Sequence, residues 1–480
     1  MNKIFYIFSL MILFSVNIFS QEKEEIITVV GDSLVGRIVS GETTREVYGH
    51  VVLTQGNVII TCNKAIQYIS RNDAELIGDV VLNQDSMTIK TPSGFYYGNE
   101  RRAESSSGVQ LDDKKVILTA DSGEYFFNED KAVFRSKVTL YDTASTLTSK
   151  ALTYYKNENR AIAMGDVEIV QKDNIIDADT LEHFRDSRVT FANSNVRIRN
   201  KSNNVQIFGD HLIDDAIGFH SVVDKNPLLL QIDTTRSRLP DSLITYSDSI
   251  RIKLDTLIIK SGTMEAYRDT INTFKAEDSV KIWRDSFASL NDYSIYLKND
   301  EKIITYRKKE GDRKPVLWNE TTQLTGDSVT IFLKKNEIQA LEVNRKAFVL
   351  SPDENYPQRY NQISGDKLIM YFDSSTVSRV DVNGNVYNVY YMYNDEQKPN
   401  GLTQSSAESA AITFKNKKVD QVRLYGSPKS EYYPENMVGG KELNYALPGF
   451  NIVENRPEKS LLIRTIKPVE RIYSPIDTLQ

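Results

Sequence analysis

A spacing of 29 residues recurs through the first half of the chain and constrains its fold more than any other feature. Valine stands at six positions that are each 29 residues apart, from Val51 to Val196. Three further columns keep this spacing, at two, nine and seventeen residues after each valine, and they hold mainly Leu and Ile or, in the last column, Tyr and Phe. A fixed period of this length indicates a repeat protein in which each copy packs on its neighbours.

Within each copy the side chains alternate with a period of two. In the segment 161–169, Ala161, Ala163 and Val167 share one face, and Asp166 and Glu168 share the other. This alternation is typical of β-strands and does not fit a helix. Asn, Asp and Gly mark two turns per copy, for example at 55–57 and 99–100, which leaves two strands of roughly 10 to 12 residues, long by usual standards.

Two rows of small residues cross these long strands. The residue two positions before each anchor valine is always Gly or Ser, and most copies place a small or modest residue near the middle of the other strand. Small residues inside strands mark bends or close backbone contacts. The first row is Gly49, Gly78, Ser107, Ser136, Gly165 and Ser194; the second is Cys62, Thr91, Ala120, Ser149 and Ala178. We therefore expect an all-β antiparallel meander, folded over along both rows, with its apolar face inside.

Periodicity alone does not decide between a filled sandwich and an open-sided trough. Either fold would bury the inward columns, which are the candidate ligand-binding residues and equally the candidate core. They comprise Val51, Leu53, Ile60, Val80, Leu82, Ile89, Val109, Leu111, Leu118, Val138, Leu140, Leu147, Val167, Ile169 and Ile176. We call these fifteen residues the inward set.

Changes in composition predict five segments. Lys3, the apolar run 4–19 and Ser20-Gln21 are typical of an export signal peptide over residues 1–20. The regular repeat lobe occupies 26–222, a linker or long loop 223–249, and a second, looser β lobe 250–425. Six prolines then predict a mostly irregular tail over 426–480.

No pattern in the chain points to catalysis, a cofactor or a metal. The sequence holds neither a nucleophile elbow nor a phosphate-binding loop, and its four histidines are scattered. Asp177 and Asp179 lie two apart on one strand, but a turn or solvent role explains them better than paired catalytic carboxylates. Basic runs such as Arg307-Lys308-Lys309 are interleaved with acidic residues, and the net charge is −6, so nucleic acid is not an expected partner.

The repeat motifs resemble the organic-solvent-tolerance (OstA-like) family. Gly-Asp-Val-Val-Leu at 78–82 is followed by Ile-x-Thr-Pro-x-x-x-x-Tyr at 89–97. Gly-Asp-Val-Glu-Ile at 165–169 is followed by Ile-Asp-Ala-Asp-x-Leu-x-x-Phe at 176–184. The resemblance covers residues 46–222 well and 250–425 loosely. The OstA-like family includes the periplasmic bridge of lipopolysaccharide transport and the N-terminal domain of the outer-membrane translocon.

This resemblance implies a folded-over β-jelly roll, or β-taco, whose apolar groove receives the acyl chains of lipopolysaccharide or a related lipid. It implies a non-enzymatic transport protein in the periplasm that assists outer-membrane assembly, and an association with the outer membrane is compatible with it. The inward set would then be the lipid site. The expected partners are other transport components, joined by edge-strand pairing, and further copies of the chain joined end to end.

A different fold remains open at this stage. An exported parallel β-helix that acts as a scaffold or binds polysaccharide can also have coils of this length. It would show three short strands per coil and stacked Asn or Gly ladders, whereas two turns and long strands per copy favour the antiparallel meander.

Overall fold

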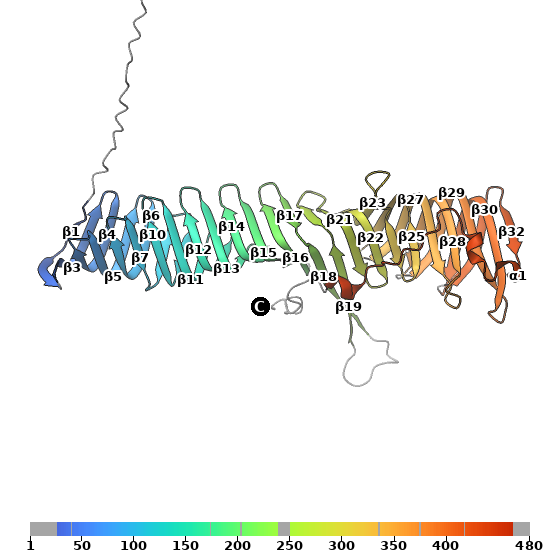
Figure 1. Cartoon of the computed structure of the whole chain (residues 1–480), viewed down its shortest axis with the longest axis horizontal. Coiled ribbons are helices and arrows are strands. Elements are labelled where there is room, and N and C mark those ends of the chain that lie inside the picture. The colour runs from blue at the N-terminus through green and yellow to red at the C-terminus, as the bar shows by residue number, and fades with distance from the viewer. Residues whose placement is uncertain are drawn as a thin grey trace, which may run out of the picture. The chain divides into compact units, whose positions relative to one another are not determined.

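The computed structural model describes residues 26–463 except 40, 173, 202–203, 239–249, 335–336, 374–375 and 417. The expected signal peptide and the end of the expected tail lie outside these residues. The chain divides into two compact units, residues 1–130 and 131–480, which are described separately. In each unit the strands follow one another in chain order (Figure 1).

Unit 1 is an antiparallel meander. Its strands are β1 (Thr28–Val30), β2 (Ser33–Val39), β3 (Glu42–Gln55), β4 (Val58–Tyr68), β5 (Asp73–Gln84), β6 (Met87–Tyr97), β7 (Arg102–Ser105), β8 (Val109–Asp112), β9 (Ile117–Ala120) and β10 (Ser122–Phe126). Consecutive long strands pair along their whole length, as β3 does with β4 and β4 with β5. Strand β6 pairs with β7 at one end and β8 at the other.

Unit 2 continues the same pattern over a longer stretch. Its strands begin with β11 (Lys131–Tyr141), β12 (Thr146–Tyr155), β13 (Arg160–Val170), β14 (Asn174–Phe184), β15 (Val189–Asn200), β16 (Val205–Asp215), β17 (His220–Asp224), β18 (Leu228–Arg238), β19 (Ile250–Lys260), β20 (Thr263–Tyr267), β21 (Thr273–Arg284) and β22 (Phe287–Leu297). They end with β23 (Lys302–Tyr306), β24 (Val316–Asn319), β25 (Thr322–Thr325), β26 (Ser328–Lys334), β27 (Glu337–Pro352), β28 (Tyr360–Asp373), β29 (Thr376–Tyr393), β30 (Pro399–Lys415), β31 (Lys418–Tyr425) and β32 (Lys429–Tyr433).

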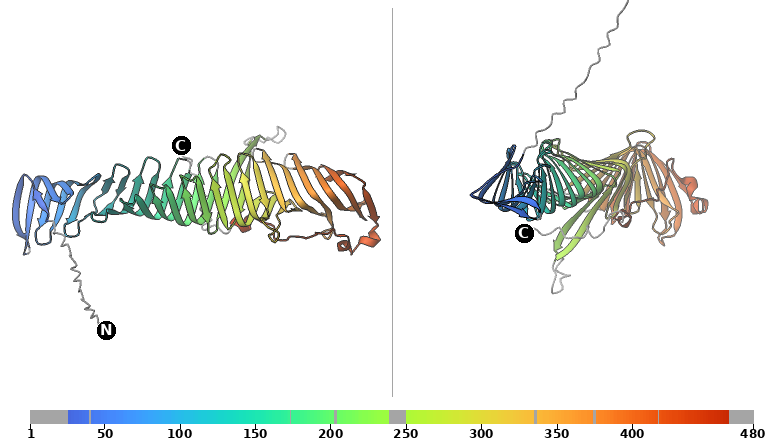
Figure 2. Two further views of the ribbon diagram at one scale, coloured as in Figure 1. Left: turned by 90° about the horizontal axis from the view of Figure 1, so that it is seen from above. Right: turned by 60° about the vertical axis from the view of Figure 1, so that its left-hand side comes forward.

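The all-β fold is therefore confirmed. The strand pairs in the described parts of both units, such as β13–β14 and β29–β30, are antiparallel, which excludes the parallel β-helix. Figure 2 shows the strands of each unit stacked side by side. The longest strands lie near the end of unit 2, where β29 has 18 residues and β30 has 17.

Alternate long strands bend at a two-residue bulge, and in the regular repeat these bulges lie in the predicted Gly/Ser row at every position except Ser107. In β13, Gly165 (φ +78°) and Asp166 (φ +45°) together oppose Asp179 of β14, and the register shifts between Met164 and Val167. Two successive residues at positive φ are costly unless Gly, Asn or Asp supplies them. The same pairs recur at 49–50, 78–79, 136–137, 194–195, 278–279, 345–346, 384–385 and 426–427. The bulges confirm the first predicted bend row.

The second small-residue row lies beside these bulges. Several of its side chains donate a hydrogen bond to the backbone carbonyl two residues later in the same strand. Ser149 Oγ donates to the Ala151 carbonyl at 3.0 Å, and Thr91 Oγ1 donates to the Ser93 carbonyl at 2.9 Å. Cys62 Sγ does the same towards the Lys64 carbonyl at 3.2 Å. Small polar side chains therefore satisfy carbonyls that the ladder leaves unpaired at the bend.

The bends divide each strand pair into two arms whose inner faces pack together. We call the arm with the inward set the anchor arm; in one copy it carries Val167, Ile169 and Ile176. The facing alanine arm carries Ala161 and Ala163, which are also buried. On the strands next to Ala163, Leu152 and Leu181 are also buried, so both arms contribute apolar side chains to the interior.

In unit 2 the sheet continues across the segment expected to be a linker, 223–249. Strand β18 occupies its first part, β16 pairs with β18, and β17 pairs with β20. Residues 239–249 lie outside the described structure. The five predicted segment boundaries stay a prediction.

The residues after β32 form what we call the C-terminal strap, residues 435–463. It contains α1 (Glu435–Val438), the 3₁₀ helix η2 (Glu442–Tyr445) and α2 (Lys459–Ile463), and residues between η2 and α2 have no regular secondary structure. Val438 and Leu447 pack against Phe348 and Leu350, while Val349 between them belongs to the interior cluster. The strap therefore covers the outer face of the anchor arm, because neighbouring side chains on a strand face opposite ways.

Candidate apolar binding site

All fifteen residues of the inward set are buried. Their exposed fractions range from 0% at Leu53, Ile60 and Leu111 to 8% at Val109. Burial of a Leu or Ile side chain stabilises a fold by about 1.5–3 kcal/mol, so these columns hold the repeat lobe together whatever else they do. Their inward direction is as expected, and their role in lipid binding stays a prediction.

In unit 1 polar side chains close the free ends of the two arms. Gln55, at the end of the anchor arm, donates to the Gly98 carbonyl at 3.0 Å and accepts the hydroxyl of Tyr96 from the alanine arm. The same pair of a glutamine and a tyrosine recurs 29 residues later. There Gln84 donates to the Phe127 carbonyl at 3.4 Å and accepts from the Tyr125 hydroxyl at 3.3 Å. We call these two sets of bonds the mouth latches.

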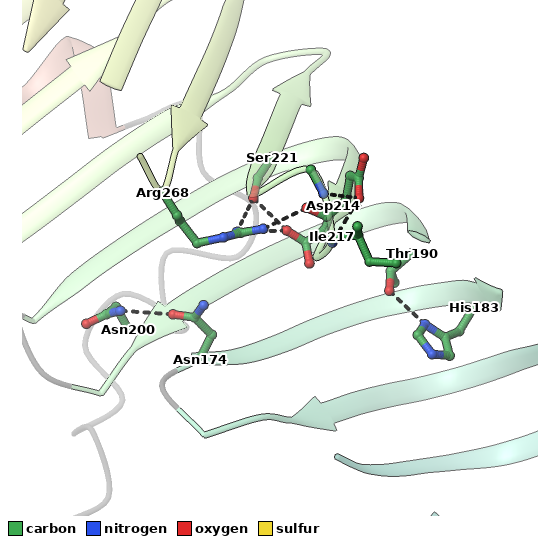
Figure 3. Close-up of polar contacts among 10 residues, drawn as sticks. Asn174, His183, Thr190, Asn200, Asp214, Ile217, Ser221 and Arg268 are labelled. Carbon is green, nitrogen blue, oxygen red and sulfur yellow. Dashed lines mark hydrogen bonds and ion pairs between the residues drawn. The ribbon is translucent and has the colours of Figure 1, made fainter. Parts of the chain in front are cut away.

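The aromatic column of the latches continues into unit 2 with a histidine. Burial lowers the pKa of His183, and its Nδ1 lies 2.9 Å from Thr190 Oγ1 (Figure 3). A neutral imidazole thus stands at the position that Tyr96, Tyr125 and Tyr154 occupy in earlier copies. Side chains that can form hydrogen bonds thus occupy this position in four successive copies, and the next copy has Leu212 there.

A polar network joins the two lobes inside unit 2. The Arg268 guanidinium donates to Asp214 Oδ1 at 3.0 Å and to Ser221 Oγ at 2.6 Å, and the hydroxyl of Ser221 donates to the same carboxylate (Figure 3). Arg268 also donates to the Asp215 carbonyl at 2.9 Å. The network fixes the free end of the alanine arm where the regular repeat gives way to the second lobe.

The second lobe holds two cavities between its arms. The larger, about 210 Å³, lies between Val349 and Ile363 of the anchor arm and Met370, Val380 and Ile412 of the alanine arm. The smaller, about 70 Å³, lies between Ile259 and Ile282 on one side and Phe274, Ile303 and Ile331 on the other. The buried walls belong to one apolar cluster. The repeat pattern did not predict these residues, because the 29-residue spacing loosens after residue 222.

The larger cavity has one apolar and one polar side. Val377, Phe414 and Val422 extend its apolar wall toward solvent, and Val422 is 40% exposed. Ser351, Asn361, Asn388 and Tyr390 line the anchor-arm side beside Val349 and Ile363. A space with this division suits an amphiphile whose hydrocarbon part lies against one wall and whose polar part lies against the other.

The outer face of the alanine arm carries the aromatic column of the repeat. The guanidinium carbons of Arg102 and Arg160 lie 4.1 and 4.3 Å from the ring centroids of Tyr97 and Tyr155. Arg160 also pairs with Glu182 at 2.8 Å. These residues stabilise the outer surface through cation–π contacts and do not line the interior.

The acidic pair and the histidines singled out in the sequence have structural partners. Asp177 pairs with Arg199 at 2.9 Å, and Asp179 accepts a hydrogen bond from Asn195 at the corner. His211 lies 2.7 Å from Asp224, and His220 stacks on Tyr267. Within the described ranges no group of three His, Cys, Asp or Glu side chains is arranged to hold a metal ion.

Both ends of the folded sheet present strand edges. In unit 1, β1 and β2 each pair with β3, and their exposed side chains include Val30 and Ile38, which are 60% and 77% exposed. In unit 2, β31 and β32 each pair with β30, and Tyr425 and Tyr432 are about half exposed. Backbone groups on such edges can pair with another strand.

The first part of the chain is similar to a known protein family. Residues 23–179 match the family described as OstA-like protein. We call this stretch the OstA-like region. The OstA-like region contains β1 to β13 and the first half of β14, and with them most of the regular repeat.

One further match is to a solved structure. LptH of Pseudomonas aeruginosa, described as the LptA-homologous periplasmic component of the lipopolysaccharide transport device, is 15% identical; the match covers 31% of this chain and 96% of LptH, with a TM-score of 0.17. No curated protein sequence matches the chain. Among the residues that the structure describes, no helix has the length and apolar character needed to cross a membrane.

Proposed function

We propose that this protein binds lipopolysaccharide or a related acylated lipid in the periplasm and assists its transport to the outer membrane. The observation that carries the proposal is an apolar interior that contains, in the second lobe, a larger cavity with polar side chains along one wall. The OstA-like region and the resemblance of its motifs supply the class of lipid. Each methylene removed from water contributes about 0.8 kcal/mol.

The two lobes play different parts in this proposal. The second lobe receives the lipid, because its interior has free volume next to partly exposed apolar side chains such as Val422 and Phe414. In the repeat lobe the inward set lines the groove only after the arms separate, since the mouth latches join them in unit 1. Lipid therefore enters at the second lobe.

The exposed edges are the proposed contacts with partners. Strands β1 and β2 at one end and β31 and β32 at the other would pair with strands of other transport components, or with another copy end to end. Export by residues 1–20 would bring the chain into the periplasm, where such partners and the lipid are found.

Site-specific photo-crosslinking in cells tests the proposal. A photoreactive residue at Met370, 4% exposed in the larger cavity, is compared with one at the neighbouring Tyr371, 38% exposed on the other face. Leu111 of the inward set is compared with Glu168, which points outward. We expect lipid adducts at Met370 and, more weakly, at Leu111. Equal labelling of the inward and outward positions would contradict a lipid-binding interior.

A further inference from the structure

A third cavity lies outside the groove, between the C-terminal strap and the outer face of the anchor arm. Its volume is about 440 Å³, which is the largest of the three cavities described here. Leu290 and Val316 form its floor, and they belong to an outer cluster with Trp318 that packs against Val453 of the strap. The cavity is therefore separate from the apolar interior.

Hydrogen bonds fix the strap above this cavity. Gln323 Nε2 donates to the Asn451 carbonyl at 2.8 Å, and its Oε1 accepts from the Val453 amide at 2.9 Å. Arg456 donates to the Ser286 carbonyl at 2.8 Å. Gln323 is itself buried, so it holds the strap backbone much as a neighbouring strand would. Both walls are thus in place before anything binds.

The polar lining of the cavity is cationic and lacks a carboxylate. Arg313 and Lys314 line one side, and the side chains of Thr325, Asn451 and Asn455 line the rest of the rim. Among the described residues, neither the Lys314 ammonium nor the Arg313 guanidinium has a hydrogen bond or ion pair. The neighbouring Arg307, by contrast, pairs with Asp327 at 2.8 Å. In the described part of the chain neither cationic group is therefore ion-paired, although the Asp292 carboxylate accepts a hydrogen bond from the Arg313 backbone amide at 3.3 Å.

The electrostatic setting of Lys314 agrees with a missing anion. Burial lowers the pKa of its ammonium, and the nearby Lys346 and Arg307 lower it further, while Asp327 opposes them. The Lys314 side chain is partly buried, and a bound oxyanion would bring a negative charge to its ammonium. The amides and the hydroxyl on the rim can both donate and accept, as hydroxyl groups of a ligand require.

We propose that this cavity binds a phosphorylated sugar, with its phosphate between Arg313 and Lys314 and its hydroxyl groups against Thr325, Asn451 and Asn455. The sugar phosphate is either free or the headgroup of a glycolipid. Because the cavity lies on the outer face, this site operates whether or not the interior binds acyl chains.

Calorimetric titration of the full chain with glucose 1-phosphate tests the site, and glucose is the uncharged comparison. We expect saturable binding of the phosphate and none of glucose, with affinity at least about tenfold weaker in Lys314→Gln and in Arg313→Gln, since each loses a charge-assisted bond. Lys90→Gln, an exposed lysine in unit 1, removes the same charge elsewhere and should bind as the parent does. In a Trp283→Phe background Trp318 is the remaining tryptophan, and its fluorescence gives an independent measure of ligand binding.

An experiment with lipid vesicles distinguishes a free sugar phosphate from the headgroup of a glycolipid. Phosphatidylcholine vesicles with a phosphorylated glucosamine glycolipid are compared with vesicles of phosphatidylcholine alone. If only the glycolipid vesicles displace glucose 1-phosphate, and Lys314→Gln abolishes this, the ligand is a lipid headgroup; if neither does, it is a soluble sugar phosphate. The proposal is overturned if glucose 1-phosphate binds no better than glucose, or if both charge variants bind as tightly as the parent.

Discussion

Asn195 Nδ2 donates to Asp179 Oδ2 at 2.6 Å, across the corner where β15 bends against β14. The same kind of contact joins Asn63 to Asp79, Asn226 to Asp210 and Asn385 to Asp366. At a similar corner Lys150 pairs with Asp166 at 2.6 Å. These side-chain bonds follow the bend from copy to copy and connect residues of adjacent strands. They explain why acidic and amide residues stand next to the small-residue rows.

The corner bond can be separated from the backbone requirement of Asn195, which has φ +52°. Asn195→Gly keeps the left-handed backbone and loses the side-chain bond, and we expect it to lower the free energy of unfolding by about 0.5–1.5 kcal/mol. Asn195→Ala should cost about 1 kcal/mol more, because Ala resists positive φ. Urea unfolding measures both. Equal stabilities of the two variants would show that the backbone conformation is not a factor.

A side chain at Gly165 should disrupt its bulge. The residue has φ +78°, and a Cβ there would lie 3.1 Å from Lys150 Cβ. Gly165→Ala should therefore cost about 1–2 kcal/mol from backbone strain alone. Gly36→Ala is the matched control, because a Cβ at Gly36 meets nothing within 4 Å. Thermal unfolding of both variants should show a lower Tm only for Gly165→Ala.

The mouth latch of unit 1 should show energetic coupling between its two side chains. Tyr96→Phe leaves a buried oxygen of Gln55 with one donor fewer, at a cost of about 1–3 kcal/mol. A double-mutant cycle with Gln55→Leu should give a coupling energy of about 0.5–3 kcal/mol. Strictly additive losses would mean that the two side chains act independently.

Tryptophan substitutions in the two lobes should differ in their effect on stability, because one enters a cavity and the other a packed core. Val422 borders the larger cavity and is 40% exposed, whereas Leu118 of the repeat lobe is fully buried. Val422→Trp should leave stability nearly unchanged and reduce lipid crosslinking at Met370. Leu118→Trp should destabilise by about 1–3 kcal/mol or more, since overpacking strains a filled core. Guanidinium unfolding gives the first readout and lipid adduct yield the second.

Attachment of the strap should weaken at alkaline pH through Tyr391. Burial, together with the nearby Glu442, raises the pKa of Tyr391 to about 12 from 10.0. Because the folded-state pKa is the higher one, the neutral phenol's contribution is fully present below pH 10 and is lost as the pH rises toward 12. Stability should therefore fall between these values by more in the parent than in Tyr391→Phe. Parallel pH profiles would contradict a titrating Tyr391 under the strap.

Stability should depend on the ion pairs that the buried Arg359 forms with its acidic partners. Its side chain is 3% exposed, and its Nη2 bonds Glu435 Oε1 at 2.5 Å and lies 3.5 Å from Glu442. Glu435→Ala should cost about 3–5 kcal/mol, because it leaves a buried charge short of a partner. Adding Arg359→Met to that variant should restore much of the loss. Limited proteolysis of residues 435–463 reports whether the strap itself is released.

Spacing and alternation in the sequence predicted the folded antiparallel sheet. A period of two sets which side chains share a face, so Val167 and Ile169 had to lie together. The Gly/Ser row marked the bends because positive φ at Gly165 is a local property of the backbone. The inward direction of the fifteen residues followed from the same parity.

The filling of the interior and the position of the strap were decided only by tertiary structure. Whether a groove is closed depends on the side chains that meet across it, such as Tyr96 and Gln55, and these come from different copies. The strap depends on contacts as distant as that of Gln323 with Asn451, 128 residues apart. Local pattern fixes the direction of each side chain, but the space left between two arms depends on all the volumes that meet there.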